Sequence, residues 1–347
     1  MSDLKTGPWN LSDLQNIPKN GLKVFSCFHC GGGSTMGYKL AGFEVLGGVE
    51  IDPEMMAIYK ANHKPKHSYL MGVQKFKTIP NSELPEELFN LDILDGSPPC
   101  SSFSMAGSRE KAWGTKKKFR EGQAEQVLDD LFFDFIDIAE KLKPKIVIAE
   151  NVKGLIQGKA KGYVKQIYQR FNEVGYDVQL FLLNAAFMGV PQKRERTFFI
   201  ARRQDLNFKS IKLNFNELPI SVKKAWQDLT CKGKDVSHSS MVKYWLKIKP
   251  GEAMSKVHEK GSLFGQIKLD PNQPSPTVTS KEYQFWYWEE PRLLSPLQSL
   301  RLQSFPDDYL TGENDVKYLC GMSVPPFMMQ RVANQIHKQW FKEVNHG

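Results

Sequence analysis

Short apolar runs alternate with helix-like segments between Leu22 and Arg203. The runs are rich in Val, Ile, Leu and Phe, as strands are, and span Leu22–Phe28, Val45–Glu50, Leu91–Asp95, Lys145–Glu150, Tyr176–Leu183 and Thr197–Arg202. The clearest helical patterns between them cover Gln123–Leu142 and Tyr163–Val174. This alternation predicts an α/β fold with a doubly wound, mostly parallel sheet. In such sheets, ligands bind beyond the carboxyl ends of the strands.

The pattern changes after Asp205, where Lys, Ser, Gly and Pro become abundant and no period is clear. We interpret this stretch as a second, smaller and irregular domain. Helical patterns return at Pro296–Ser304 and Pro326–Trp340. The predicted organisation is a main domain over 1–204 plus 318–347, a second domain over 205–290 and a hinge segment over 291–317.

The charge and the apolar content narrow the class of protein. Lys and Arg number 47 against 38 Asp and Glu, and the net charge of +9 suits a polyanionic partner, although a merely basic protein has the same balance. No signal peptide is visible at Met1–Asn10, and no run approaches the ~18 apolar residues of a membrane span. Five widely spread cysteines do not resemble a disulfide framework, so we expect a reducing, cytoplasmic location.

A glycine-rich segment, Phe28-His29-Cys30-Gly31-Gly32-Gly33, follows the first predicted strand. Glycines let the backbone approach a ligand closely, and the start of the next helix is electropositive. The second strand ends at Glu50, where a pair of ribose hydroxyls is usually held. The pattern G-x-G-x-x-G is absent, which argues against NAD. A plain tight turn is the alternative interpretation.

Cys27 and Cys30 form a lone C-x-x-C within the same segment. A structural zinc site needs four ligands, and no matching second pair exists, so we expect no metal. A redox role next to a βαβ unit and simple packing of the two thiols both stay open.

Cys100 is the first candidate nucleophile, in the segment from Gly96 to Ser104. Pro98 and Pro99 stiffen the chain just before the thiol, and a rigidly presented cysteine at a strand end suits nucleophilic attack. A buried structural cysteine is the alternative. The basic stretch that follows, Arg109–Arg120, suits a phosphate backbone, unless it is a solvated run of charges.

Two further segments carry charged residues at strand ends. Glu150 ends one predicted strand, and a carboxyl group there could donate a proton. Arg194 and Arg196 lie just before another, and in an extended run they would face the same side. Arginine offers a fixed donor geometry for a carbonyl or a phosphate.

Together these segments resemble the cytosine-C5 DNA methyltransferase family, of the bacterial or phage type. The motifs follow the family's order from Val24 to Ile336. They are Pro99-Cys100, Glu150-Asn151-Val152, Gln192-x-Arg194-x-Arg196, Arg292-Leu293-Leu294-Ser295 leading to the run Arg301–Asp307, and Gly321-Met322-Ser323-Val324-Pro325. The fold that this resemblance implies is the Rossmann-like methyltransferase fold with a target-recognition domain.

The resemblance implies a catalytic role for Cys100, Glu150, Arg194 and Arg196. Cys100 would attack C6 of cytosine, which makes C5 nucleophilic. Glu150 would contact N3 and the exocyclic amine, Arg196 the base carbonyl, and Arg194 would support the site. Because the reacting atoms are hidden in a duplex, the base must be flipped out.

The resemblance also implies S-adenosyl-L-methionine as the cofactor. Phe28 would pack on the adenine, Glu50 would hold the ribose hydroxyls, and Ile51 would lie beside the adenine. The remaining implied pocket residues are Gly31, Gly32, Gly33, Ser97, Leu131, Ser323 and Val324.

Double-stranded DNA is the implied partner of a protein that we expect to be a monomer. The region 206–290 would recognise the target sequence through base edges in the major groove. The residues expected to contact DNA are Ser104, Arg109, Lys116, Lys117, Lys118, Gln192, Thr277 and Val278. Such an enzyme would serve a restriction–modification or phage protection system in a bacterial or phage-infected cell. A cognate restriction endonuclease would not contact it directly.

Several positions depart from the family's usual residues. Ser26 stands where an acid is usual, two residues before the adenine-packing Phe28, and Cys30 replaces the first motif glycine. The acid expected after the third strand is missing near Met71-Gly72-Val73. Gln298 stands for a usual Glu and Met322 for a usual Asn. All of these concern the cofactor pocket or its surroundings, while the catalytic set is intact.

Three rival hypotheses remain. The tRNA-methylating branch of the family shares the catalytic residues, but the long region 206–290 and the run from Ser101 to Ser104 favour DNA. A regulator without catalysis would be expected to lose Cys100 or Glu150, and neither is lost. Enzymes that methylate exocyclic amines place an aromatic residue after the prolines, where this chain has Cys100.

Overall fold

The computed structural model describes residues 7–99, 130–157, 161–230, 233–281, 283–312 and 316–342, and the backbone of 116–117 and 126–127. The chain divides into two compact units. The sheet unit comprises Asn16–Leu183, Glu195–Asn214 and Met329–Gly347. The accessory unit comprises Met1–Gln15, Asn184–Arg194 and Phe215–Met328.

A seven-stranded sheet forms the centre of the sheet unit, in the order β3-β2-β1-β4-β7-β10-β8. The first five strands in this order run parallel, and β10 pairs antiparallel with β7. Their bounds are β1 Lys23–Cys27, β2 Glu44–Glu50, β3 His67–Leu70, β4 Ile93–Gly96, β7 Ile146–Val152, β8 Tyr176–Asn184 and β10 Glu195–Arg203. The predicted mostly parallel α/β fold is confirmed.

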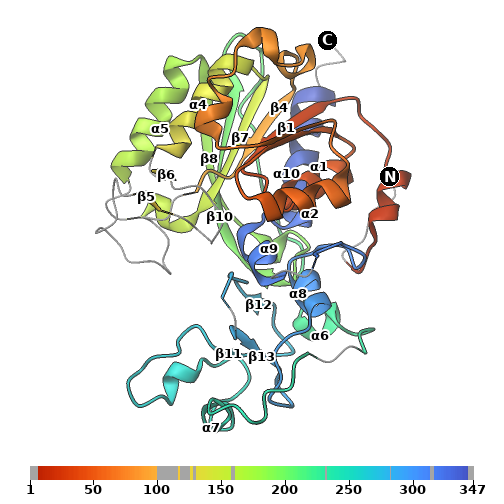
Figure 1. Ribbon diagram of the computed structural model, residues 1–347, viewed down its shortest axis with the longest axis vertical. Coiled ribbons are helices and arrows are strands. Elements are labelled where there is room, and N and C mark those ends of the chain that lie inside the picture. The colour runs from red at the N-terminus through yellow and green to blue at the C-terminus, as the bar shows by residue number, and fades with distance from the viewer. Residues whose placement is uncertain are drawn as a thin grey trace. The chain divides into compact units, whose positions relative to one another are not determined.

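Helices cover both faces of this sheet (Figure 1). They are α1 Gly33–Leu40, α2 Pro53–His63, α3 Val73–Phe76, α4 Leu131–Leu142, α5 Lys161–Glu173 and α10 Pro326–Ile336. Figure 1 shows α4 and α5 on one side of the strands and α1, α2 and α10 on the other. The apolar stripe of α4 packs with Phe25 and Val49 of the sheet and with Phe171 of α5 in one buried cluster. Burying both faces explains why most strands are continuous apolar runs.

Two predicted helices differ from the observed ones. The helix expected from Gln123 is wrong at Gln126–Val127, which form strand β6 and pair with β5, Lys116–Lys117. Helix α4 begins only at Leu131, where its buried face begins. The helix expected to run from Pro326 to Trp340 ends as an α-helix at Ile336 and continues as a π-helix over His337–Lys342.

Short elements build the accessory unit. It contains helices α6 Val222–Ala225, α7 Val242–Trp245, α8 Pro296–Leu302 and α9 Val316–Met322, and the strand pairs β9 Gln192–Lys193 with β12 Ser275–Pro276, and β11 Ile267–Lys268 with β13 Phe285–Trp286. Trp245, Trp286 and Met254 belong to its own small apolar core. Ser295 and Gln298 cap the start of α8 reciprocally, so Gln298 performs at this turn the capping that a Glu could also perform.

No helix among the described residues is both long and apolar enough to cross a membrane.

Candidate active site

Three parallel strands bring the predicted segments to one edge of the sheet. In the register of β1, β4 and β7, Cys27 pairs with Gly96, and Gly96 pairs with Ala149. The residues that follow are the glycine-rich turn after β1, Ser97-Pro98-Pro99 after β4, and Glu150 in β7. The carboxyl ends of parallel strands meet at the same edge, which is where ligands bind in this fold class.

Asn151 fastens the start of the Pro-Pro-Cys loop to β7. Its side-chain amide donates a hydrogen bond of 2.9 Å to the carbonyl oxygen of Pro98, and both residues are buried. The backbone carbonyl of Asn151 accepts a hydrogen bond of 3.0 Å from the hydroxyl of Thr197 on β10. Cys100 itself lies outside the described residues. The motif around Glu150 signalled this region, but the sequence did not reveal that Asn151 holds the loop.

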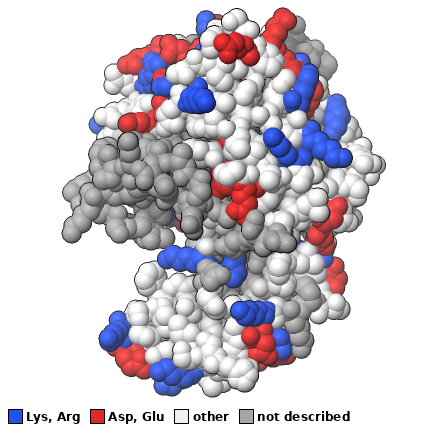
Figure 2. Space-filling view, viewed as in Figure 1, with Lys and Arg blue, Asp and Glu red and all other residues white. Residues whose placement is uncertain are grey.

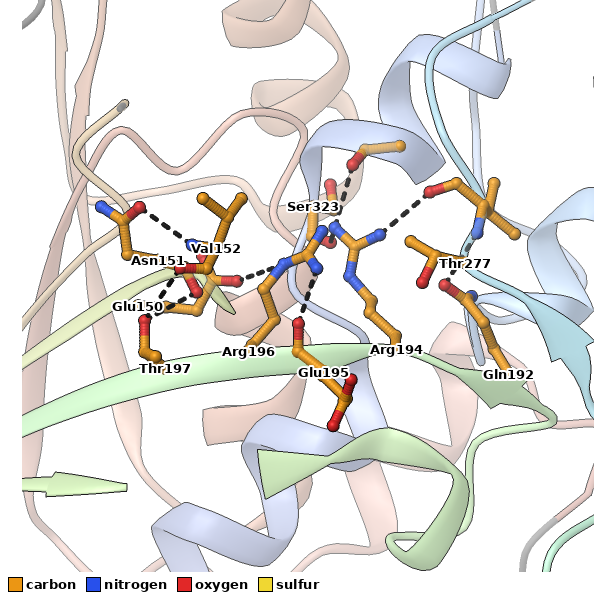
Figure 3. Close-up of polar contacts among 12 residues, drawn as sticks. Glu150, Asn151, Val152, Gln192, Arg194, Glu195, Arg196, Thr197, Thr277 and Ser323 are labelled. Carbon is orange, nitrogen blue, oxygen red and sulfur yellow. Dashed lines mark hydrogen bonds and ion pairs between the residues drawn. The ribbon is translucent and has the colours of Figure 1, made fainter. Parts of the chain in front are cut away.

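Glu150 and Arg196 form an ion pair on neighbouring strands (Figure 3). The distance from Arg196 Nε to Glu150 Oε1 is 2.9 Å, and both side chains are largely buried. The pairing of Arg196 with Val152 across β10 and β7 places the guanidinium beside the carboxylate. Burial lowers the pKa of Arg196, while the charge of Glu150 opposes this shift. The pair thus presents an oriented carboxylate and an oriented cation at the carboxyl edge of the sheet.

Arg194 belongs to the accessory unit, and it lies between β9 and β10 rather than within one extended run. Its guanidinium donates hydrogen bonds to three backbone carbonyl oxygens, at 3.0 Å to Val278, 2.9 Å to Gly321 and 3.1 Å to Ser323 (Figure 3). Only 2% of the residue is exposed. The fork of arginine donors therefore joins the predicted Thr277-Val278 segment to the predicted Ser323-Val324 segment within this unit.

Gln192 extends the same framework. Its amide donates to the Leu302 carbonyl at 3.1 Å and to the Gln303 side chain at 2.6 Å, and it accepts from the Val278 backbone at 3.0 Å. Gln192 is fully buried, so the structure shows its amide engaged inside the accessory unit. Its predicted DNA contact stays a prediction. Thr277 is half-buried, and its hydroxyl donates to the Lys193 carbonyl at 2.8 Å.

The glycine-rich turn has a left-handed backbone at three positions, Phe28 (φ 55°), Cys30 (φ 49°) and Gly32 (φ 98°). Cys30, which replaces a usual glycine, thus adopts a conformation that glycine adopts at less cost. Its N–H donates to Glu50 Oε2 at 2.8 Å. Glu50 Oε1 accepts from the N–H groups of Ile51 and Asp52 at 2.8 and 2.9 Å. Glu50 therefore ties the turn after β1 to the end of β2.

These contacts leave Glu50 suited to a ribose. A carboxylate offers about four acceptor positions, and three amide donors leave room for one hydroxyl. Burial raises the pKa of Glu50 to about 7, and the amide donors oppose the rise. The ring of Phe28 is half-buried against Phe135. Ile51 and Ser97 are also half-buried, whereas Leu131 is fully buried in the core beneath this edge.

Asp95 on β4 is a buried carboxylate that sequence reasoning did not single out. It accepts hydrogen bonds from the hydroxyls of Ser26 at 2.7 Å, Ser34 at 2.9 Å and Tyr38 at 3.1 Å. Burial raises its pKa to about 6, although the three hydroxyl donors oppose the rise. The predicted strand Leu91–Asp95 holds two Asp residues among apolar ones, and the sequence alone did not distinguish Asp95 from Asp92.

Part of the predicted DNA-contacting set lies outside the described residues, namely Ser104, Arg109 and Lys118. The backbone of Lys116 and Lys117 is described as strand β5, without their side chains. On the face drawn in Figure 2, the described Lys and Arg side chains are spread among Asp and Glu rather than gathered in one patch. Among the described residues, no group of His, Cys, Asp and Glu could hold a metal ion.

We expect Arg194→Lys to destabilise the accessory unit. A lysine cannot reach three carbonyls in the fork geometry, and a lost hydrogen bond to a charged group costs about 1.5–3 kcal/mol. Urea unfolding followed by tryptophan fluorescence measures this, since Trp226, Trp245 and Trp286 belong to that unit. The control is Lys193→Ala, because Lys193 is exposed. Equal midpoints for both variants and wild type would contradict the role of Arg194.

Asp95→Asn should change how stability depends on pH. The pKa of Asp95 rises from 3.8 to about 6 on folding, so the folded state holds the extra proton in this range. The stability of wild type relative to Asp95→Asn should therefore be highest below pH 4 and fall as pH rises through 6, by at most about 3 kcal/mol. Urea unfolding of both proteins between pH 4.5 and 7.5 measures the difference, and a constant difference would rule out this titration.

Comparison with known proteins agrees with this geometry. A family model described as C-5 cytosine-specific DNA methylase matches residues 22–338. The chain is 30% identical to the type II methyltransferase M.FnuDI of Fusobacterium nucleatum, over 91% of this chain and 94% of that protein. It is 27% identical to the type II methyltransferase M1.HphI of Haemophilus parahaemolyticus, over 91% and 87% of the two chains.

Solved structures share the fold. A prophage-encoded E. coli protein named as a DNA modification methyltransferase matches with a TM-score of 0.70 at 21% identity, over 92% of this chain and 99% of that one. Spodoptera frugiperda DNMT2 matches with a TM-score of 0.61 at 18% identity, over 91% and 99% of the two chains. The family model and the near full-length relative decide the family: the chain belongs to the C-5 cytosine-specific DNA methylases and is a DNA (cytosine-5-)-methyltransferase.

Proposed function

We propose that this enzyme methylates cytosine within a specific sequence of duplex DNA, with Cys100 as nucleophile and S-adenosyl-L-methionine as methyl donor. The observation that carries the proposal is the hydrogen bond from Asn151 to Pro98, next to the Glu150–Arg196 ion pair. This contact holds Pro98, two residues before Cys100, against the strand that carries Glu150. The relatives M.FnuDI and M1.HphI are both named type II methyltransferases, which supports a sequence-specific DNA substrate.

Cys100, Glu150 and Arg196 have different roles toward the target cytosine. The Cys100 thiolate forms a bond to C6, and the electron pair of the C5–C6 double bond makes C5 nucleophilic. Glu150 contacts N3 and the exocyclic amine, and Arg196 both orients Glu150 and contacts the base carbonyl. Since the ion pair engages Glu150 Oε1, we assign Oε2 to the base. After methylation, a base removes the C5 proton, and elimination breaks the S–C6 bond and frees Cys100.

The turn after β1 and the end of β2 would hold the cofactor. Glu50 has an acceptor position left for a ribose hydroxyl, and the half-buried ring of Phe28 is suited to cover an adenine. Gly31, Gly32 and Gly33 would lie along the methionine part, with Ile51, Ser97 and Leu131 around them. Ser323 and Val324 are the remaining positions that the family resemblance implies for the pocket. When bound, S-adenosyl-L-methionine supplies an electrophilic methyl group on a sulfonium.

Target recognition would come from the region 206–290, together with the basic stretch from Arg109 to Arg120. Thr277 and Val278 are held in a framework by Lys193, Gln192 and Arg194, which supports a fixed presentation of the residues around them. We further propose a monomeric enzyme that acts in the cytoplasm of a bacterial or phage-infected cell. It would protect DNA, alone or alongside a restriction endonuclease that it does not contact.

Expression in a host that lacks cytosine methylation, followed by bisulfite sequencing, tests the function. We expect protection of cytosine in one recurring sequence with wild type, and none with Cys100→Ser. Purified enzyme is then assayed for methyl transfer to duplex DNA and to tRNA. Label that enters only tRNA would overturn the proposed substrate.

Glu150→Gln should reduce the rate of methyl transfer by a factor on the order of 10²–10⁴, because the amide neither donates a proton in the same way nor pairs with Arg196. Single-turnover kinetics with target DNA measures the step directly. The matched control is Glu195→Gln, since Glu195 pairs with Lys153 and is more exposed. Full activity of Glu150→Gln would disprove the role of Glu150.

A further inference from the structure

We propose that Asp95 is a positioning residue that couples the glycine-rich turn to the Pro-Pro-Cys loop and supplies, from β4, the carboxylate that the family usually carries at position 26. The proposal rests on the proposed function, since it concerns the geometry of the cofactor and nucleophile loops. It explains how this chain can lack the usual acid at Ser26.

The strand register puts the carboxylate in place. Ser26 of β1 and Asp95 of β4 are direct partners in adjacent parallel strands. The Ser26 hydroxyl donates to Asp95 Oδ2 at 2.7 Å, and both residues are buried, at 1% and 2% exposed. A carboxylate on either strand would therefore occupy nearly the same region. Two carboxylates this close would repel each other, so acids at both positions 26 and 95 would be destabilising.

Asp95 also holds the helix that follows the glycine-rich turn. Ser34 and Tyr38 lie four residues apart on α1, hence on one face, and both hydroxyls donate to Asp95. Helix α1 begins at Gly33, directly after the left-handed Gly32. The distance between this helix start and β4 is therefore fixed by hydrogen bonds to a single charged group, which are stronger than bonds between neutral groups.

The same residue stands at the base of the nucleophile loop. Gly96 follows Asp95, and its Cα faces Phe135, whose ring would lie 2.5 Å from an added Cβ. The loop then continues through Ser97 to Pro98, which Asn151 holds. A shift of Asp95 would move the start of α1 and the start of this loop together. The partners of Asp95 thus include one side chain of β1 and two side chains of α1.

A carboxylate exchange tests the proposal. The proteins compared are wild type, Asp95→Ser, Ser26→Asp and the double variant Ser26→Asp/Asp95→Ser. Calorimetry measures the dissociation constant of S-adenosyl-L-methionine, and thermal unfolding reports on the fold. We expect each single change to weaken cofactor binding about tenfold, which corresponds to about 1.4 kcal/mol, and the double variant to recover most of the loss.

Asp92→Asn is the matched control. Asp92 is also a buried carboxylate next to the same strand, but it accepts from the Lys23 N–H and the Lys145 ammonium at the amino end of the sheet, each at 2.7 Å. The substitution Asp92→Asn should lower the unfolding temperature and leave the cofactor dissociation constant unchanged. If Asp95→Ser does not fold, Ser34→Ala and Tyr38→Phe each remove one donor, and each should raise KM for the cofactor more than it lowers kcat.

The outcomes are distinct. Wild-type cofactor affinity in a folded Asp95→Ser, or in both Ser34→Ala and Tyr38→Phe, would overturn the coupling role. A folded double variant that binds no better than the single variants would overturn the exchange. Wild type that neither binds S-adenosyl-L-methionine nor forms a covalent adduct with DNA carrying 5-fluorocytosine would refute the proposed function itself, and this inference with it.

Discussion

The parallel pairing of β1, β4 and β7 is the constraint on which the site depends. Parallel strands must all end at the same edge, so residues far apart in the chain meet there without any contact of their own. The antiparallel β10 then enters from the opposite direction and delivers Arg196 to the same edge as Glu150. The topology of the sheet thus brings together Glu150, Arg196, the turn after β1 and the loop after β4.

Buried polar contacts convert this approximate placement into a defined geometry. Asn151, Glu50 and Asp95 each use a side chain to hold backbone or hydroxyl groups of a neighbouring segment. A buried carboxylate costs free energy unless it is well hydrogen-bonded, and both Glu50 and Asp95 accept three such bonds. The strands are held by burial of apolar surface, whereas the loops at their ends are held by these polar groups.

Apolar patterns and motifs in the sequence predicted most strands of the sheet and the segments of the site. Six strands were predicted within two residues of their observed bounds because each contains a short run rich in apolar residues. Strand β3 was missed, since His67–Leu70 is a half-buried edge strand and carries polar residues. The start of α4 was misplaced, because Gln126 and Val127 suit a helix locally but pair as a strand. The roles of Asn151 and Asp95 depend on partners 53 and up to 69 residues away, which a single sequence does not reveal.

Apart from the hydrogen bond between the side chains of Gln192 and Gln303, the framework in the accessory unit binds main-chain atoms. Arg194 binds three backbone carbonyls, and Gln192 binds the carbonyl of Leu302 and the N–H of Val278. Hydrogen bonds to backbone atoms do not depend on the side chains of the segments that they hold. Substitutions of the side chains around Val278 would therefore leave the backbone hydrogen bonds to Arg194 and Gln192 intact. In the recognition role proposed for the region 206–290, such a scaffold would make a change of DNA specificity a local change of side chains.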